Sequence, residues 1–151
     1  IMRKRIFIVL GILLILAGVS TVGFAAMIAP KHPSDYHIGI SYEDAQKSEK
    51  PMLVVFYADW CTYCLKFMPK FNILSKLYGD KFNFVMVNVE ENASTEKLAH
   101  NVGIVGFPTV YILDPKYDNK VLLSNSIYQD LGKFRIELDR YLRIRALIDK
   151  K

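Results

Sequence analysis

Cys61 and Cys64 are the only cysteines in this chain of 151 residues, and they follow its single tryptophan, Trp60. Three kinds of chemistry use cysteines three positions apart: half of a zinc site, a disulfide that stabilises the fold, or a dithiol that is reversibly oxidised. A tetrahedral zinc site needs four ligands, and none of the 3 histidines has the spacing of a second ligand pair. A disulfide closing so short a loop would restrict the unfolded chain little. The pattern therefore favours redox chemistry without a metal.

The position of the pair in the chain assigns a different role to each cysteine. Cys61 comes after a continuous apolar run, residues 52–58, and opens a predicted helix over residues 61–77. The free N–H groups at a helix N-terminus stabilise an anion and would lower the pKa of the Cys61 thiol. Cys64 lies one turn further along the same side. We expect Cys61 to attack a substrate and Cys64 to resolve the mixed disulfide.

The N-terminus predicts export of the domain. Three basic residues, Arg3, Lys4 and Arg5, precede residues 6–29, which contain no charged side chain. At about 1.5 Å per residue, this run is long enough to span a bilayer of roughly 30 Å. The basic cluster would stay in the cytoplasm, and the domain would lie on the other side.

A cleaved signal peptide explains the same residues equally well. Residues 6–19 form a compact apolar stretch, and Gly23 and Ala25 are small residues of the kind that precede a cleavage site. We therefore expect a signal peptide or membrane anchor over 1–29, a linker over 30–40 and one domain over 41–149. Both alternatives export the domain to a compartment where disulfides persist. A bacterial periplasm or cell envelope fits the segment best, and a eukaryotic secretory lumen is the other location that the residues allow.

The distribution of charged residues does not indicate binding to a nucleic acid. From residue 30 onward the chain has 17 lysines and arginines against 15 aspartates and glutamates, and they are interspersed. A nucleic-acid-binding protein is expected to gather basic residues on one face or in a motif. The sequence predicts a solvated surface of mixed charge instead.

The apolar patterns predict an α/β domain. Strands alternate with helices at first, which indicates parallel strands joined by right-handed crossovers, and a hairpin then adds antiparallel strands at one edge. Helices should cover both faces of this mixed sheet, giving three layers. In the last helix Arg145 should lie at the rim of the apolar face with its head in water. The expected helices are 41–50, 61–77, 92–103 and 129–148, and the expected strands are 52–58, 82–89, 108–113 and 120–124.

Three segments together resemble the thioredoxin superfamily. They are "FYADWCTYCLKF" at 56–67, "NVEEN" at 88–92 and "VGIVGFPTVYIL" at 102–113, and the resemblance extends over nearly all of residues 37–148. Within the superfamily, the chain is most similar to exported or membrane-anchored thiol–disulfide reductase domains, such as the C-terminal domain of the electron-relay protein DsbD. The resemblance implies a thioredoxin-like fold.

The resemblance also implies a substrate-binding surface around the cysteines. It predicts a cis bond between Phe107 and Pro108, facing the pair, with the backbone at Phe107 pairing with an extended substrate. Trp60 would form a contact platform, although packing in the core is the alternative. Thr62 and Tyr63, between the cysteines, would tune the stability of the disulfide, and Tyr63 would add an aromatic contact.

Thr62 and Tyr63 depart from the family pattern, because thioredoxin has Gly-Pro there, and two further positions depart from it as well. Thioredoxins usually carry a buried aspartate six residues before the first cysteine, where this chain has Val55, and its lysine partner falls on Met86. Replacing both charges is physically coherent, because losing one alone would leave a buried charge unpaired. The acceptor for the Cys64 proton is then open, with Asp59, Glu90 and water as candidates.

We expect an exported thiol–disulfide oxidoreductase that reduces disulfides in cell-envelope proteins. It would use no cofactor besides the redox-active Cys61–Cys64 disulfide and would act as a monomer. Its electrons would come from a membrane donor similar to DsbD or CcdA. The alternatives are a disulfide oxidase or isomerase of the same fold, or a thioredoxin-fold module that binds partners without catalysis.

Overall fold

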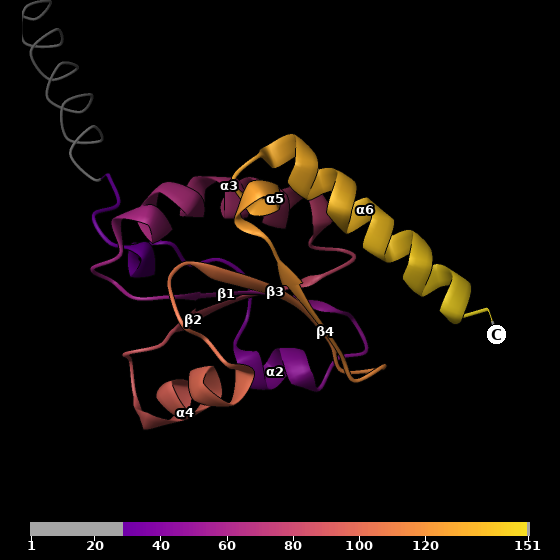
Figure 1. Cartoon of the computed structure of the whole chain (residues 1–151), viewed down its shortest axis with the longest axis horizontal. Coiled ribbons are helices and arrows are strands. Elements are labelled where there is room, and N and C mark those ends of the chain that lie inside the picture. The colour runs from indigo at the N-terminus through magenta and orange to yellow at the C-terminus, as the bar shows by residue number, and fades with distance from the viewer. Residues whose placement is uncertain (1–28, 151) are drawn as a thin grey trace, which may run out of the picture. The chain divides into compact units, whose positions relative to one another are not determined.

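A four-stranded mixed sheet forms the centre of the domain in the computed structural model, which describes residues 29–150 (Figure 1). Its strand order is β2-β1-β3-β4. β1 runs parallel to β2, whereas β3 is antiparallel to both β1 and β4. The expected mixed sheet with an antiparallel edge is confirmed. The strands are β1 (Met52–Tyr57), β2 (Asn83–Asn88), β3 (Thr109–Asp114) and β4 (Asn119–Leu123).

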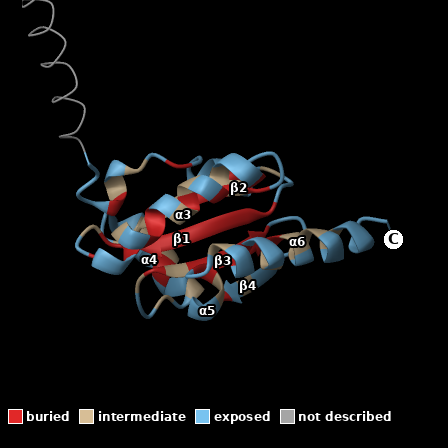
Figure 2. Cartoon of the chain, turned by 90° about the horizontal axis from the view of Figure 1, so that it is seen from above, coloured by how far each residue is buried: buried red, intermediate tan, exposed pale blue. Residues whose placement is uncertain are grey.

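β1 is the central element because every one of its residues is apolar or aromatic and buried. Alternate side chains of a strand point to opposite faces, so β1 contributes to two separate cores. Leu53, Val55 and Tyr57 enter the core that also contains both cysteines. Met52, Val54 and Phe56 enter the other. Figure 2 shows β1 as a buried strand between helices whose outer surfaces are exposed.

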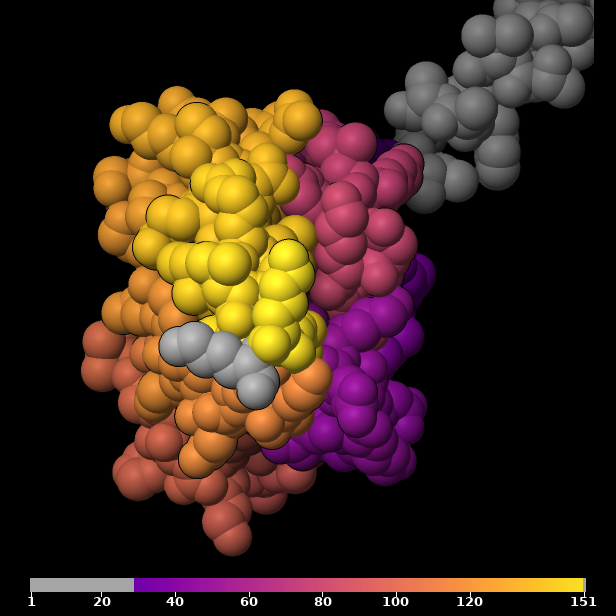
Figure 3. All heavy atoms as spheres, turned by 90° about the vertical axis from the view of Figure 1, so that its right-hand side faces the viewer, coloured from indigo at the N-terminus to yellow at the C-terminus, as the bar shows by residue number. Residues whose placement is uncertain are grey.

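Helices cover both faces of the sheet (Figure 1). α3 (Thr62–Tyr78), α5 (Asn125–Tyr128) and α6 (Leu131–Ile148) lie on the face with the larger core, and α2 (Tyr42–Gln46) and α4 (Ala93–Val102) lie on the other. α6 packs beside α3, as Figure 3 shows from the side. The rings of Phe67 and Phe134 stack between these two helices, with 6.3 Å between their centroids.

The ends of the helices follow the capping residues in the sequence. The Ser41 hydroxyl accepts a hydrogen bond from the Asp44 N–H at 3.1 Å, so Ser41 is the N-cap of α2. Asn92 caps α4 in the same way. α4 ends at Gly103, which has a φ of 84°, a left-handed conformation that glycine adopts without strain.

Within the segment that the sequence indicates as a linker, residues 30–40, Pro33 and Ile38 are buried against the domain. The segment contains a 3₁₀ helix, η1 (Pro33–Asp35), and then runs along β2, where the Ile40 N–H donates to the Phe84 carbonyl at 3.0 Å. Gly39 lies so close to that carbonyl that a side chain would collide with it. The compact unit accordingly begins at His32.

The expectation that the Arg145 head lies in water is wrong. Its Nε donates to Asp114 at 2.7 Å, and a second guanidinium nitrogen donates to the Glu49 carbonyl at 2.6 Å. Asp114 is almost completely buried at the end of β3 and also accepts from the Tyr141 hydroxyl at 3.0 Å. A buried carboxylate needs a charged and hydrogen-bonded partner, and Arg145 supplies it.

The expected signal peptide or anchor, residues 1–29, lies outside the described residues except for its last position. Within the described range of 29–150, the helices are all too short or too polar to cross a bilayer.

Candidate active site

Cys61 and Cys64 form a disulfide at the N-terminus of α3, with 5.2 Å between their Cα atoms. β1 ends at Tyr57, and a short turn, in which the Cys61 N–H donates to the Ala58 carbonyl, leads to Cys61 as the N-cap. The Cys64 N–H donates to the Cys61 Sγ at 3.1 Å. This N–H group would equally stabilise a thiolate at Cys61, because orphan N–H groups at a helix start favour an anion.

The two cysteines are not equally exposed. Cys61 is 5% exposed and Cys64 is completely buried. An attacking disulfide or thiol can therefore reach Cys61 and not Cys64 without a movement of α3. The geometry fits the expected division between an attacking and a resolving thiol.

The loop that precedes β3 has the predicted cis bond between Phe107 and Pro108. The ring of Phe107 packs edge-on against Trp60, with 5.9 Å between the ring centroids. Thr109 closes the loop by donating its hydroxyl to the Gly106 carbonyl at 2.7 Å. The structure thus brings together predicted site residues from two segments more than 40 positions apart.

Trp60 lies on the surface and not in the core. Its side chain is 67% exposed, which makes the core-packing alternative wrong. The indole Nε1 donates to both carboxylate oxygens of Glu90 at 3.0 Å each. Phe107 on one side and Glu90 on another hold this exposed indole beside the disulfide.

Thr62 and Tyr63 lie in the first turn of α3 and face solvent. Tyr63 is 69% exposed, and the Lys66 ammonium stands 5.9 Å from its ring centroid. Together with Trp60, this ring gives the rim of the disulfide an aromatic surface that no other described part of the chain covers.

Comparison with known proteins agrees with this geometry. The sequence matches the thioredoxin family over residues 40–129, which is more than half of the chain. The chain belongs to the thioredoxin family.

Its relatives include proteins named for thiol chemistry. It is 51% identical over 79 residues to the thiol:disulfide interchange protein TxlA homolog of Synechocystis, covering 52% of this chain and 41% of that protein. It is 40% identical over 75 residues to the chloroplastic thioredoxin-like protein HCF164 of Arabidopsis thaliana, covering 50% and 28%. The chain spans about a third of the length of the first curated relatives that it matches.

Solved structures show the same fold. The Trx4 domain of ERdj5 has a TM-score of 0.56 at 19% identity, covering 71% of this chain and 97% of that domain. The thioredoxin Deadhead of Drosophila melanogaster has a TM-score of 0.53 at 19% identity, covering 76% and 98%. Fold, family and the Cys61–Cys64 pair identify residues 40–129 as a thioredoxin domain with a pair of cysteines three positions apart.

The two positions at which this thioredoxin lacks the aspartate and lysine usual in the family are neighbours. Val55 in β1 is directly paired with Met86 in β2, and Val55 is completely buried. Met86 packs against the same core from its edge. Among the described residues, the one buried charged side chain is that of Asp114, which lies four residues beyond the β3 partner of Val55 and is paired with Arg145.

The two carboxylates considered as proton acceptors for Cys64 have other partners. Asp59 accepts from the Ser34 N–H of η1 at 3.1 Å and from the Asn88 side chain at 3.3 Å. Glu90 is bound to the Trp60 indole. Through these hydrogen bonds, Asp59 holds η1 against the end of the domain that carries the disulfide.

Two tyrosines of the site were missed by sequence reasoning. Tyr57 ends β1 beside a hollow of about 570 Å³ that Asp59 and Glu91 also line, and burial together with these two charges raises the pKa of Tyr57 to about 12. Tyr128 donates its hydroxyl to the Pro108 carbonyl at 3.0 Å. In the sequence, Tyr57 is only the end of an apolar run, and Tyr128 lies one residue before the predicted last helix. Neither position indicates a role at the site.

Proposed function

We propose that this thioredoxin reduces disulfide bonds in protein substrates, with Cys61 as the nucleophile and Cys64 as the resolving thiol. The observation that carries the proposal is the Cys61–Cys64 disulfide at the start of α3, with the Cys64 N–H donating to the Cys61 Sγ. The relatives named as thiol:disulfide interchange proteins support it.

Each turnover exchanges one disulfide for another. The Cys61 thiolate attacks one sulfur of the substrate disulfide, the other substrate sulfur leaves as a thiolate and takes a proton, and a mixed disulfide forms. Cys64 then loses its proton and attacks the Cys61 sulfur, which releases the second substrate thiol and leaves the enzyme disulfide. The hydrogen bonds of Asp59 and Glu90 run to Ser34, Asn88 and Trp60 and not to Cys64, so we assign the Cys64 proton to water.

The surface around the pair would bind the substrate. The backbone at Phe107, beside Pro108, would pair with an extended substrate segment, as the family resemblance implies. The exposed rings of Trp60 and Tyr63, together with the exposed Thr62, would contact the side chains that flank the substrate disulfide.

The enzyme would work outside the cytoplasm, in a cell envelope. The basic cluster and the uncharged run at residues 6–29 support this location, whether the run is an anchor or a cleaved signal. A reductase in an oxidising compartment needs a supply of electrons, so the Cys61–Cys64 disulfide would be reduced again by a membrane donor similar to DsbD or CcdA.

A trapping experiment tests the roles of the cysteines. A Cys64→Ser variant should accumulate a mixed disulfide with reducible insulin, visible as a shift on a non-reducing gel, because the resolving thiol is missing. A Cys61→Ser variant serves as the matched control and should neither trap nor reduce insulin. Unchanged insulin reduction by Cys61→Ser would refute catalysis and leave a binding module.

The reduction potential decides the direction. Equilibration of the wild-type pair with glutathione should give a value near that of thioredoxin, about −270 mV. A value near that of DsbA, about −120 mV, would instead assign the enzyme to the oxidase alternative.

A further inference from the structure

Tyr128 makes a buried polar contact with the loop that carries Pro108. It is the last residue of α5, and its side chain is only 7% exposed. Its hydroxyl donates to the Pro108 carbonyl at 3.0 Å. The first residue of β3 that pairs with β1 is Thr109. The Pro108 carbonyl precedes it and therefore lies outside the pairing of these two strands.

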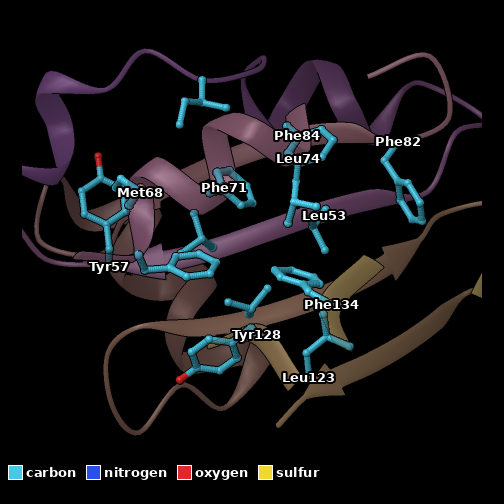
Figure 4. Packing of buried hydrophobic residues seen from close by; sticks show 14 of the residues in the cluster. Leu53, Tyr57, Met68, Phe71, Leu74, Phe82, Phe84, Leu123, Tyr128 and Phe134 are labelled. Carbon is cyan, nitrogen blue, oxygen red and sulfur yellow. The ribbon is translucent and has the colours of Figure 1, made fainter. Parts of the chain in front are cut away.

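The ring of Tyr128 contacts the helix that carries the cysteines. It packs edge-on against Phe67, with 5.4 Å between the centroids and 73° between the ring planes. Phe67 follows Cys64 by three residues on α3, so the two side chains lie on the same side of the helix. Figure 4 shows Tyr128 in the packed cluster with Leu123 and Phe134, its hydroxyl oxygen directed out of the cluster.

One side chain therefore joins the two halves of the site. The ring is fixed against α3 through Phe67, and the hydroxyl is fixed to the loop through Pro108. We infer that Tyr128 is a positioning residue: it holds the Phe107–Pro108 loop at a set distance from the cysteines, so that a protein substrate can pair with the loop while its disulfide meets Cys61. This inference rests on the proposed function.

The hydroxyl and the ring have separable effects. A phenylalanine would fill the same space and keep the contact with Phe67, but it would leave the Pro108 carbonyl buried without this donor. The carbonyl would then shift toward water, and Phe107 would move with it along the chain. Reduction of protein substrates that pair with the loop should become less efficient. Reduction of a small disulfide that contacts only Cys61 should be unaffected.

Steady-state kinetics of the full-length chain with Tyr128→Phe test the inference. With dithiothreitol as electron source, we expect the KM for insulin to rise roughly tenfold, the factor that follows from loss of one buried hydrogen bond. The rate with oxidised glutathione should stay within about twofold of the wild type, because no extended segment has to pair. The thermal unfolding midpoint, measured in parallel, shows that the variant is folded.

Tyr78→Phe is the matched control. The Tyr78 hydroxyl donates to Asp139 at 2.9 Å near the other end of α3, so the variant loses a comparable hydrogen bond far from the loop. It should leave the KM for insulin unchanged. Equal effects of the two variants on insulin, or an equal loss with insulin and glutathione in Tyr128→Phe, would overturn the inference. If the wild type itself does not reduce insulin through Cys61, the proposed function fails first.

Discussion

Val55 and Met86 stand directly opposite each other on β1 and β2, at the two positions where thioredoxins usually carry an aspartate and a lysine. Val55 is completely buried, and Met86 packs against the same core. The two apolar residues that replace the charged pair are therefore in adjacent positions, as the aspartate and lysine would be. A single charge at either position would lack its partner, which explains why an apolar residue at one requires an apolar residue at the other.

Restoring the aspartate alone should destabilise the fold. Val55→Asp places a carboxyl in a dry core, which raises its pKa and lowers the free energy of unfolding by about 3–5 kcal/mol at neutral pH. Because the folded-state pKa lies above the unfolded value, the loss should be smaller at pH 4 and grow as the pH rises. Urea unfolding at several pH values measures it.

The double variant Val55→Asp/Met86→Lys is the control for this prediction. Its lysine would reach the new carboxylate across the strand pair, so part of the lost stability should return at neutral pH. A double variant no more stable than Val55→Asp would show that the two side chains do not meet.

Local sequence signals were enough to predict the arrangement around the cysteines. The uniformly apolar run before Cys61 indicates a strand buried on both faces, and β1 is such a strand. The sequence predicts Ser41 as the cap of α2 and either Asn92 or Ser94 as the cap of α4, and the observed caps are Ser41 and Asn92. Each of these features depends on neighbours within a few residues, which a single sequence displays directly.

Contacts between distant segments could not be predicted in the same way. Ile73 and Leu77 fit the apolar pattern of α3, yet they are 45% and 50% exposed, because α3 turns Phe71 and Leu74 toward the sheet instead. Nothing near Arg145 shows that it would meet Asp114, 31 positions away. Such pairs are decided by tertiary packing, which overrides local pattern.

Removal of the Arg145 side chain should cost much more than loss of a surface charge. Arg145→Ala would leave Asp114, which is 1% exposed, with only the Tyr141 hydroxyl and the Lys116 N–H as donors. We expect the free energy of unfolding to fall by about 3–5 kcal/mol, measured by guanidinium denaturation. Arg140→Ala removes an arginine that pairs with Glu137 on the surface and should change little. Similar losses in both variants would contradict a buried ion pair.

Alkaline conditions should weaken the end of β1 that leads to the disulfide. Burial, with the charges of Asp59 and Glu91, raises the pKa of Tyr57 to about 12 from its ordinary value of 10.0. The folded state therefore holds the phenol proton more tightly, so this stability is complete below pH 10 and is lost as the pH rises toward 12. Tyr57→Phe should flatten the fall in stability between those values, followed by denaturation at each pH. An unchanged pH profile would mean that another group controls alkaline unfolding.

The contact between Glu90 and Trp60 should determine how firmly the indole stands beside the cysteines. Glu90→Ala removes both acceptors of the Nε1–H, so the exposed ring should move more freely, and the KM for a protein disulfide should rise roughly two- to tenfold. Trp60 is the only tryptophan, so its fluorescence anisotropy reports the motion without interference. Glu91→Ala removes the neighbouring carboxylate, whereas the indole N–H donates to Glu90, so this variant should leave the anisotropy unchanged. Equal anisotropy in wild type and Glu90→Ala would show that Phe107 alone holds the ring.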